Sequence, residues 1–431
     1  MVSVIGGGLA GCEAAYALAQ AGIKVRLYEM RPKNRTEAHT TDFLGELVCS
    51  SSLKSTDTET AHGLLKSEMR YFDSLVLRAG EYARVPGGGA LCVDKDLFGK
   101  YITETIRSHP NIEVVNEEIT DFPKDWSVIA TGPLTSSAFA ETLSSELSSE
   151  RLFFFDAIAP SVSEDSIDYS KVFRQSRYDK GDADYINCPF TKEEYYAFLD
   201  ELLGAKKAEL HLECEKAVYY EGCLPVEVMA SRGRETLRYG MMKSRGLTNP
   251  HTGSHPYAVV QLRQENREGS VYGLVGFQTQ LTIGEQKRIF RMIPGLENCE
   301  FVRFGQVHRN TYIKSPDFLN KYLQYAKNSK IFFAGQLIGV EGYMESAAMG
   351  IAAGHNLARL LTGKEMIEFP PYTMMGALIG HVTEKCDDYQ PSGSNFGLLP
   401  NENIKGNKRG RKIQKSALAQ KTFSEFIEKL K

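Results

Sequence analysis

Two cysteines lie in turns, where a thiol is positioned to act as a nucleophile. Cys49 stands where an apolar strand end meets a run of serines. Cys223 stands between a glycine and Leu224-Pro225. A thiolate adds readily to electron-poor carbon, so both residues are candidates for covalent catalysis. The alternative is the commoner state of a free cysteine, a small apolar side chain in the core. Three others fall in apolar contexts that favour this state: Cys12, Cys92 and Cys299.

A cluster of cations follows Cys223 closely in the sequence. Its members are Arg232, Arg234, Arg238, Lys243 and Arg245. Such a cluster can contact phosphates, and we expect Arg232, Arg234 and Arg238 to bind RNA. The alternative is a solvated surface on which these cations pair with Glu227 and Glu235.

The N-terminal residues have the pattern of a dinucleotide-binding unit. A β-rich run, Val2–Ile5, leads into the glycine-rich turn 6–11. The next segment, Glu13–Ala19, reads as a helix, and Lys24–Glu29 reads as a second strand. A glycine fingerprint is weak evidence alone, but the strand before it, the helix after it and an acid about 20 residues on make it specific.

Each residue of this turn has a physical reason to be there. Gly6 permits the tight turn, Gly8 lets a pyrophosphate approach the backbone, and Gly11 allows close packing of helix and strand. The helix N-terminus then faces the phosphates, and Glu29 can accept hydrogen bonds from ribose hydroxyls. The predicted cofactor-binding residues here are Gly6, Gly7, Gly8, Leu9, Ala10, Gly11 and Glu29.

Two later segments repeat the design of a buried strand that ends at a small residue. They are Trp126–Gly132 and Lys330–Gln336, and the second leads into a helix rich in small residues. Such a helix can bring its N-terminus close to a cofactor. We therefore add four residues to the predicted cofactor site: Gly335, Gln336, Gly342 and Tyr343.

Because these two later strands resemble the first one in design, we predict an α/β fold in which one nucleotide-binding sheet is interrupted by a large insertion. We expect a discontinuous Rossmann-like dinucleotide-binding domain over residues 1–160 and 326–390. An α+β insertion domain would span 161–325, and a basic segment 391–431 would follow.

Composition excludes several classes of protein. The chain has 431 residues, of which 42% are apolar and 24% charged, so it can bury a core and is not disordered overall. No apolar run approaches the roughly 18 residues of a membrane-spanning helix. Eight scattered cysteines without a CxxC pair predict neither disulfides nor a metal site. We expect a cytoplasmic protein that binds no membrane and no metal.

Charge is uneven along the chain. From Lys405 onward nine bases stand against two acids, so this segment carries +7 and the first 404 residues carry −10. A basic end on an acidic body indicates a polyanion partner, and a loosely ordered, solvated tail is the alternative. The predicted RNA contacts in this segment are Lys408, Arg409, Arg411 and Lys412.

The motifs of the chain closely resemble those of the bacterial folate- and FAD-dependent tRNA uracil-5-methyltransferases. The resemblance covers almost the whole chain, and its Gly-Cys-Leu-Pro block is specific to that family. It is carried by Leu27–Pro32, Glu46–Ser50, Gly63–Met69, Val85–Leu91, Tyr178–Gly181, Glu221–Glu227, Leu274–Thr279, His308–Tyr312, Phe333–Gln336, Glu341–Tyr343 and Asn395–Pro400.

This resemblance implies that the dinucleotide-binding domain is an FAD-binding domain similar to that of glutathione reductase. It places the insertion 161–325 on the folate and RNA side. It also implies a reaction and roles for three residues. The carbon of 5,10-methylenetetrahydrofolate would pass via FAD, reduced by NADH or NADPH, to uracil C5, forming 5-methyluridine at T-loop uridine 54 of tRNA. Cys223 would be the nucleophile that adds at C6. Cys49 would be the second thiol, either as proton acceptor or as a guard of the flavin adduct. His308 would contact the folate pterin.

Some positions depart from the family pattern and leave the RNA target open. Ser51 replaces a usual Asn, and Met241, Ser244 and Arg245 replace a commonly Pro-containing stretch. The same chemistry on 23S ribosomal RNA is therefore an alternative. From other classes, a flavin oxidoreductase acting on a small molecule and a non-catalytic flavin-bound RNA-binding protein are further alternatives. The choice of NADH or NADPH and the oligomeric state stay open.

Overall fold

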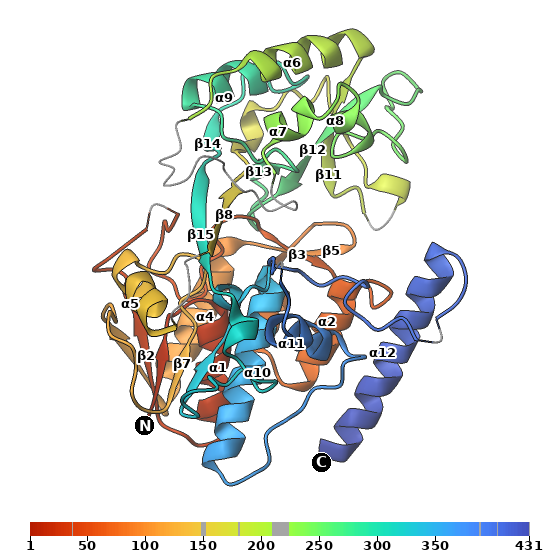
Figure 1. The fold of residues 1–431 in the computed structure, drawn as a ribbon. Coiled ribbons are helices and arrows are strands. Elements are labelled where there is room, and N and C mark those ends of the chain that lie inside the picture. Colours follow the sequence, from red (N-terminus) through yellow and green to blue (C-terminus); the bar gives the residue numbers. More distant parts are fainter. Residues whose placement is uncertain are drawn as a thin grey trace.

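The structure is a computed structural model that describes residues 1–36, 38–147, 152–179, 182–208, 224–387, 389–402 and 404–430. Figure 1 shows a lower part built on a parallel sheet and an upper part built on an antiparallel sheet. Both marked chain ends lie in the lower part. Each part has a core of its own, because buried apolar residues form two large separate clusters.

The lower sheet has five parallel strands in the order β16-β7-β1-β2-β6. Parallel strands are covered on both faces, and the apolar residues of β1, β7 and β16 are accordingly buried. The strand order reverses at β1, with β2 on one side of it and β7 on the other, and ligands bind at such a switch point. The strands are β1 (Val2–Ile5), β2 (Val25–Glu29), β6 (Ile112–Asn116), β7 (Ser127–Ile129) and β16 (Ile331–Phe333).

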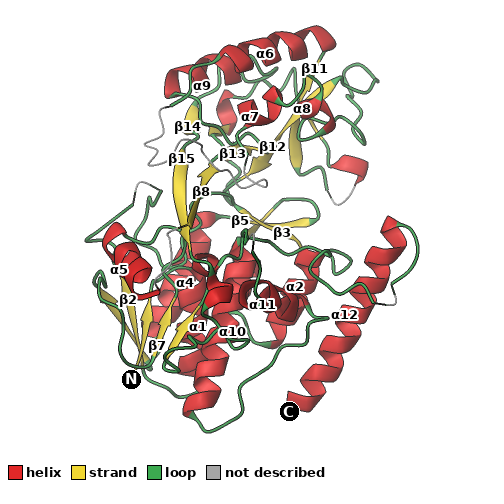
Figure 2. Cartoon of the chain, in the orientation of Figure 1, coloured by secondary structure: helices red, strands yellow, loops and turns green. Residues whose placement is uncertain are grey.

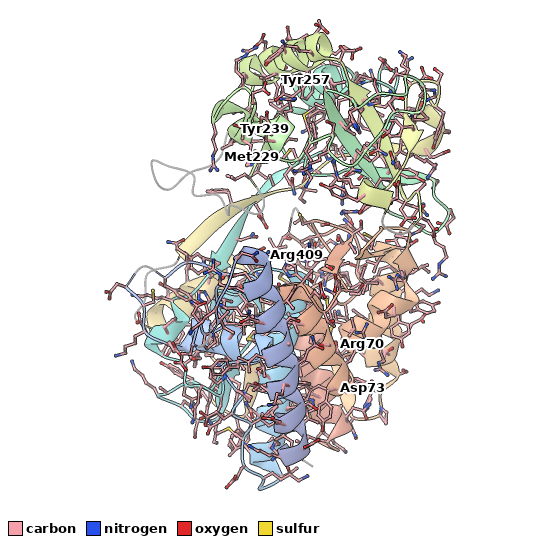
Figure 3. The ribbon with its side chains drawn as sticks, turned by 90° about the vertical axis from the view of Figure 1, so that its right-hand side faces the viewer. Arg70, Asp73, Met229, Tyr239, Tyr257 and Arg409 are labelled. Atoms are coloured by element: carbon pink, nitrogen blue, oxygen red, sulfur yellow. The ribbon has the colours of Figure 1, made fainter. Side chains whose placement is uncertain are left out.

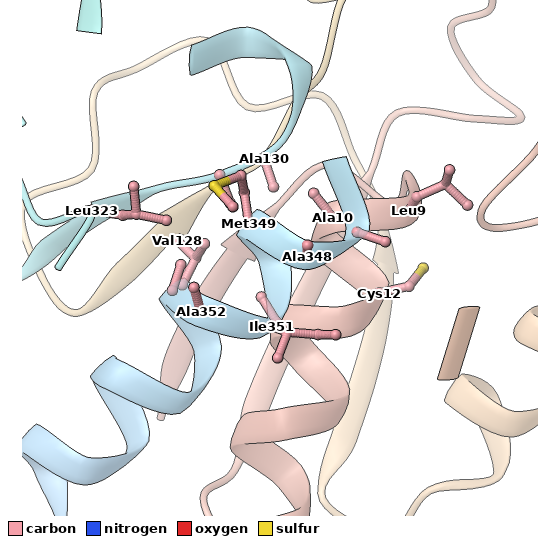
Figure 4. Packing of buried hydrophobic residues seen from close by; sticks show 14 of the residues in the cluster. Leu9, Ala10, Cys12, Val128, Ala130, Leu323, Ala348, Met349, Ile351 and Ala352 are labelled. Atoms are coloured by element: carbon pink, nitrogen blue, oxygen red, sulfur yellow. The ribbon is translucent and has the colours of Figure 1, made fainter. Parts of the chain in front are cut away.

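Helices cover this sheet, and the closest packing joins two of them. Helices α1 and α10 pack side by side, and Ala10, Cys12, Ala348 and Ile351 belong to the buried apolar cluster of this part (Figure 4). A Cβ at Gly350 would lie 2.2 Å from the Ala10 carbonyl oxygen, so only glycine permits this approach. The helices are α1 (Leu9–Gln20), α2 (Ala61–Tyr71), α3 (Leu75–Tyr82), α4 (Lys95–Ser108), α5 (Ser137–Leu147), α10 (Tyr343–Leu361) and α11 (Met374–Thr383).

A small antiparallel sheet, β3-β5-β4, lies where the two parts meet (Figure 1). It is formed by β3 (Ser52–Ser55), β4 (Arg84–Val85) and β5 (Ala90–Val93). Directly after β5, the Asp94 carboxylate accepts hydrogen bonds from the amides of Asp96 and Leu97 and so starts α4. This cap fixes where Lys95 emerges.

The upper sheet has six strands in the order β10-β11-β12-β13-β9-β14. Its strand pairs are antiparallel, and four helices lie in the same part of the molecule (Figure 2). The strands are β9 (Ser161–Ser163), β10 (Phe173–Arg174), β11 (Tyr185–Phe190), β12 (Ala258–Gln264), β13 (Val271–Leu274) and β14 (Phe301–Arg303). The helices are α6 (Lys192–Gly204), α7 (Val226–Ser231), α8 (Thr236–Tyr239) and α9 (Ile283–Phe290).

Two paired antiparallel strands connect the parts. They are β8 (Leu152–Ala157) and β15 (Val307–Tyr312), with His308 opposite Asp156. Figure 1 shows this ribbon running from the upper part down to the lower one. The chain therefore enters and leaves the upper part through neighbouring strands.

The basic C-terminal segment forms a long helix, α12 (Lys408–Leu430). Apolar residues lie on one side of this helix. Ala419 is fully buried there, and Phe423 packs its ring against Tyr71 and Phe72. The Lys415 ammonium donates to the carbonyls of Phe396 and Leu399. The alternative of a loosely ordered tail is therefore wrong, because this helix buries apolar side chains. Among the described helices, none combines the length and the apolar character needed to cross a membrane.

Candidate active site

A cavity with an empty volume of about 1020 Å³ opens at the carboxyl ends of β1, β7 and β16. It is lined by nine of the eleven residues predicted to bind the cofactor: Gly6, Gly7, Gly8, Leu9, Ala10, Glu29, Gly335, Gln336 and Tyr343. The other two, Gly11 and Gly342, stand behind this wall within the starts of α1 and α10. The fold thus brings the glycine-rich turn after β1 together with the segment that follows β16.

The turn before α1 has the shape that a pyrophosphate requires. Gly6 has φ of +103°, and a Cβ at Gly11 would lie only 1.8 Å from the Gly6 carbonyl oxygen. A Cβ at Gly8, in contrast, would meet no atom within 4 Å, because this residue faces the open cavity. Gly8 caps α1 without a side-chain hydrogen bond, and no acid occupies the described first turn. The first amides of α1 can therefore bind an anion.

Glu29 is held rigidly at the end of β2. Its carboxylate accepts hydrogen bonds from the amides of Gly7 and Arg31, both at 3.0 Å, and from the Arg31 Nε at 2.9 Å. Burial opposes ionisation, but Arg31 prevails and holds the pKa of Glu29 below its ordinary value. Arg31 in turn binds Glu46 at 2.7 Å. Arg31 and Glu46 also line the cavity, and their presence in the resembling motifs was the signal for them in the sequence.

These residues fit an FAD. A glycine turn open to the cavity, uncapped amides at a helix start and an ionised carboxylate at the end of the neighbouring strand β2 can take a pyrophosphate and a ribose. The cavity continues past Gly335 to Tyr343, leaving room for the far end of a dinucleotide. Further along α10 the small residues Ser346, Ala347 and Ala348 follow, and Ser346 lines the cavity, which lets a cofactor approach.

Cys49 is held against the far end of this cavity. Its amide and that of Ser50 donate to the Tyr343 hydroxyl at 2.8 and 3.1 Å. Its carbonyl accepts from the Lys95 Nζ at 3.1 Å, and its side chain is half-buried. The predicted strand before Cys49 is wrong, since Leu47 and Val48 are irregular and β3 begins only at Ser52. The contact with Tyr343 rather than a strand therefore positions this thiol.

Two buried titratable groups, Tyr343 and Glu341, lie near Cys49. Burial, together with the nearby Cys49, raises the pKa of Tyr343 well above its ordinary value. Burial and the Asp156 charge raise the pKa of Glu341, whose carboxyl also accepts a hydrogen bond from the Gln336 amide at 2.6 Å. Both shifts favour the protonated form of these groups, beside a thiol. The arrangement can support proton transfer at a group bound next to the cofactor. Glu341 was not singled out as a site residue from the sequence.

The side chains of two predicted site residues lie outside the described part of the chain. Cys223 lies outside the described residues, and the chain resumes at Leu224, just before α7. His308 has its backbone in β15, opposite Asp156, but its side chain is outside the described part. Glu227, near Cys223 in sequence, is buried and accepts hydrogen bonds from the Thr279 hydroxyl and the Gln280 amide. It therefore serves the packing of α7 rather than the cation cluster.

The predicted RNA contacts form two groups on different parts of the molecule. In the upper part, Arg238 pairs with Glu235 at 2.8 Å and Arg234 with Asp200 at 2.6 Å, while Arg232 ends α7 on the surface. In the lower part, Arg409, Arg411 and Lys412 are exposed at the start of α12. Figure 3 shows Arg409 at the end of α12 that points toward the upper part. The Lys408 side chain lies outside the described residues.

Comparisons with known proteins agree with this geometry. The family model of glucose inhibited division protein A matches residues 1–365. A methylenetetrahydrofolate–tRNA-(uracil-5-)-methyltransferase TrmFO from Dictyoglomus turgidum is 56% identical over 401 residues, covering 92% of this chain and 91% of the relative. The protein of the same name from Citrifermentans bemidjiense is 52% identical over 431 residues, covering 99% and 98%.

A solved structure shares the fold. GidA from Aquifex aeolicus, in its form I crystal, aligns over 100% of this chain and 78% of its own, with a TM-score of 0.69. Sequence identity in that alignment is 18%, so the likeness concerns the fold. It confirms the predicted α/β class with a Rossmann-like parallel sheet.

Proposed function

The chain belongs to the glucose inhibited division protein A family and, within it, to the methylenetetrahydrofolate–tRNA-(uracil-5-)-methyltransferases, and we propose that it methylates C5 of a uridine in tRNA. It is an enzyme that takes the carbon from 5,10-methylenetetrahydrofolate and uses FAD, with NADH or NADPH as reductant. One observation carries the proposal: the Cys49 backbone is bound by Tyr343, a residue that lines the predicted FAD cavity.

The residues of the cavity would hold the cofactor. The α1 amides near Gly8 would bind the pyrophosphate and Glu29 the ribose, while Gly335 and Gln336 would contact the far half. FAD, when bound, supplies the electrons that reduce the transferred carbon to a methyl group. The protein's own contribution is to position folate and uracil at that end of the cavity and to move protons there.

The two thiols would divide the chemistry at uracil. Uracil C5 is a poor nucleophile until a thiolate adds at C6 and raises the electron density at C5. We assign that addition to Cys223, in the family-specific turn. Cys49 would accept the C5 proton or guard the cofactor, with Glu341 and Tyr343 as buried neighbours whose pKa values are raised. His308 would contact the folate pterin.

RNA would reach this site from the side of the molecule shown in Figure 3. Exposed cations of α12 would neutralise backbone phosphates of the RNA. The arginines of α7 and α8 would bind further phosphates in exchange for their present carboxylate partners. The names of the relatives specify tRNA, which favours T-loop uridine over ribosomal RNA and a cytoplasmic site of action. For the domains, we propose an FAD-binding domain of residues 1–160 and 326–390 and an insertion of 161–325. Two separate apolar clusters support two units, although the lower cluster already includes Ile313, Phe318, Leu319, Leu323 and Tyr325.

A label-transfer experiment tests the function. Purified protein is incubated with FAD, NADH or NADPH, methylenetetrahydrofolate labelled in its methylene carbon, and either unmodified tRNA or 23S rRNA. We expect label in 5-methyluridine of tRNA. Label found only in ribosomal RNA would show that ribosomal RNA, and not tRNA, is the substrate. Methylation by labelled S-adenosylmethionine without folate or reduced flavin would refute the proposal.

A further inference from the structure

A second cavity, with an empty volume of about 680 Å³, lies beside the cofactor cavity and shares Glu46 and Val48 with it. Its wall combines the loop 38–48, the start of α4 and the segment 303–306 that leads into β15. It therefore lies where the two parts of the molecule meet, directly behind Cys49. None of the roles proposed above uses it.

Two cations, Lys95 and Arg303, line this cavity and have N–H donors without an acceptor among the described residues. Lys95 gives one hydrogen bond, to the Cys49 carbonyl. The Arg303 guanidinium approaches Glu265 only at 3.8 Å, and its buried Nε has no hydrogen-bond partner among the described residues. A buried guanidinium N–H without an acceptor is costly, so an anion in the cavity would be favourable.

One of the nearby carboxylates faces both cations and the others do not. Burial opposes ionisation of Glu265, but the charges of Lys95 and Arg303 prevail and hold its pKa below the ordinary value, so it offsets part of their charge. Glu46 is bound by Arg31 and by the Thr40 amide at 2.8 Å. Glu265 accepts a hydrogen bond from the Ser161 hydroxyl at 2.6 Å, and Asp96 is exposed at the rim. Burial, and then the Arg303 charge, lower the pKa of Lys95 to about 8. The two cations therefore crowd each other in a partly buried space.

We propose that this cavity binds the glutamate carboxylates of the folate substrate, with Lys95 and Arg303 as their ligands. The inference rests on the proposed function, which requires the pterin end of folate to lie near His308. From there the chain runs back to Gln306 and Arg303, five residues that span at most about 18 Å. Phe304 offers the aminobenzoyl ring an apolar wall on the way. A folate lying along this segment would place its carboxylates between the two cations.

Substrate truncation tests the assignment in the holoprotein. The flavin spectrum is titrated with 5-formyltetrahydrofolate and with 5-formyltetrahydropteroate, which lacks the glutamate. We expect the wild type to bind the folate about tenfold more tightly or better, since charge-assisted hydrogen bonds are lost in the pteroate. Lys95→Met and Arg303→Met should each remove most of that difference and leave pteroate binding unchanged, and Arg303→Lys should restore part of it.

Lys100→Met is the matched control, because Lys100 lies on the same helix, is exposed and faces Glu104 at 3.8 Å. It should bind both compounds like the wild type. Equal binding of the two compounds by the wild type, or equal losses for both in the variants, would overturn the proposal. So would variants that weaken only NADPH or RNA binding, since the cations would then serve a phosphate. If the wild type bound neither compound, the proposed function itself would fail.

Discussion

At the scale of single residues, Gly8 and Gly11 belong to one turn but are glycines for different reasons. A side chain at Gly8 would enter the open cavity, and its φ of −77° suits any residue. A side chain at Gly11 would collide with the Gly6 backbone. We therefore expect Gly8→Val to lose most of its FAD and keep its thermal stability without flavin. Gly11→Val should lose both, because a backbone clash has no way to relax.

The ratio of flavin to protein absorbance, together with thermal unfolding of the apoproteins, measures these effects. Full flavin occupancy in Gly8→Val would show that the pyrophosphate lies elsewhere.

The two thiols make separable predictions. Cys223→Ala should abolish methylation and also the covalent adduct with 5-fluorouridine-containing RNA, because only a group bonded to C6 activates C5. Cys49→Ala should also cripple turnover but should still form the adduct, since Tyr343 and Lys95 hold Cys49 by its backbone, which alanine retains. Mass spectrometry of the digested adduct identifies the modified residue. A nucleotide on Cys49 would reverse the assignment.

At the scale of elements, one face of α12 packs on the protein and another face exposes cations to solvent. One face packs on the core through Ala419 and Phe423, while Arg409, Arg411 and Lys412 are exposed. Deleting the segment would therefore unfold a packed surface as well as remove charge. Replacing the three exposed cations by Gln is the cleaner change, and we expect weaker RNA binding, uniform over sequences, with flavin binding and stability intact.

Salt dependence is the decisive measurement for α12. Each phosphate contact contributes about 0.9 to the slope of log K against log salt, so the triple variant should flatten the slope by about 2 to 3. A control in which exposed Lys100 and Lys327 become Gln should keep the wild-type slope. An unchanged slope in the triple variant would leave α12 with a packing role alone.

A second element-scale prediction concerns the joint between α2 and α11. The buried carboxyl of Glu68 accepts hydrogen bonds from the amides of Met374 and Met375, both at 2.7 Å. Burial outweighs these bonds and raises its pKa from 4.5 to about 8. Between these values the unfolded chain releases the proton and the folded chain keeps it, so this contribution to stability is full below pH 4.5 and is lost by pH 8.

Glu68→Gln should remove this dependence, since glutamine stays neutral at every pH. Urea unfolding at pH 5 and pH 8 measures it: the wild type should lose more free energy of unfolding between these pH values than the variant does. An equal loss in both proteins would assign the pH dependence to other groups, such as Glu13, whose pKa burial raises to about 7.

At the scale of the whole molecule, the residues that line the cofactor cavity belong to the lower part, and the second apolar cluster belongs to the upper part. A ligand stabilises only the unit that binds it. If the two cores unfold separately, removing FAD should lower the temperature of one calorimetric transition by several degrees and leave the other in place. Re-addition of FAD is the control. Equal shifts of both transitions would contradict the proposed domains.

The sequence by itself determined the local units of this protein. The strand, turn and helix around Gly6–Gly11 and the late strand that ends before Gly335 were correctly predicted, as was the α/β class. These features depend on short-range effects: glycine permits a backbone that other residues avoid, and runs of branched apolar residues form buried strands. The family motifs indicated the roles of the two thiols and the identity of the substrates. The role of Cys223 and the domain limits stay predictions.

Tertiary structure alone decided which distant residues meet. Tyr343 binds the Cys49 backbone across 294 positions, Glu68 caps a helix that begins 306 positions later, and Arg303 shares a cavity with Lys95. It also decided that the basic tail is a docked helix. Contacts of this kind follow from how the sheet, helices and connecting strands pack as a whole. No local spacing encodes them, because the free energy that forms them is the burial of surfaces contributed by many separate segments.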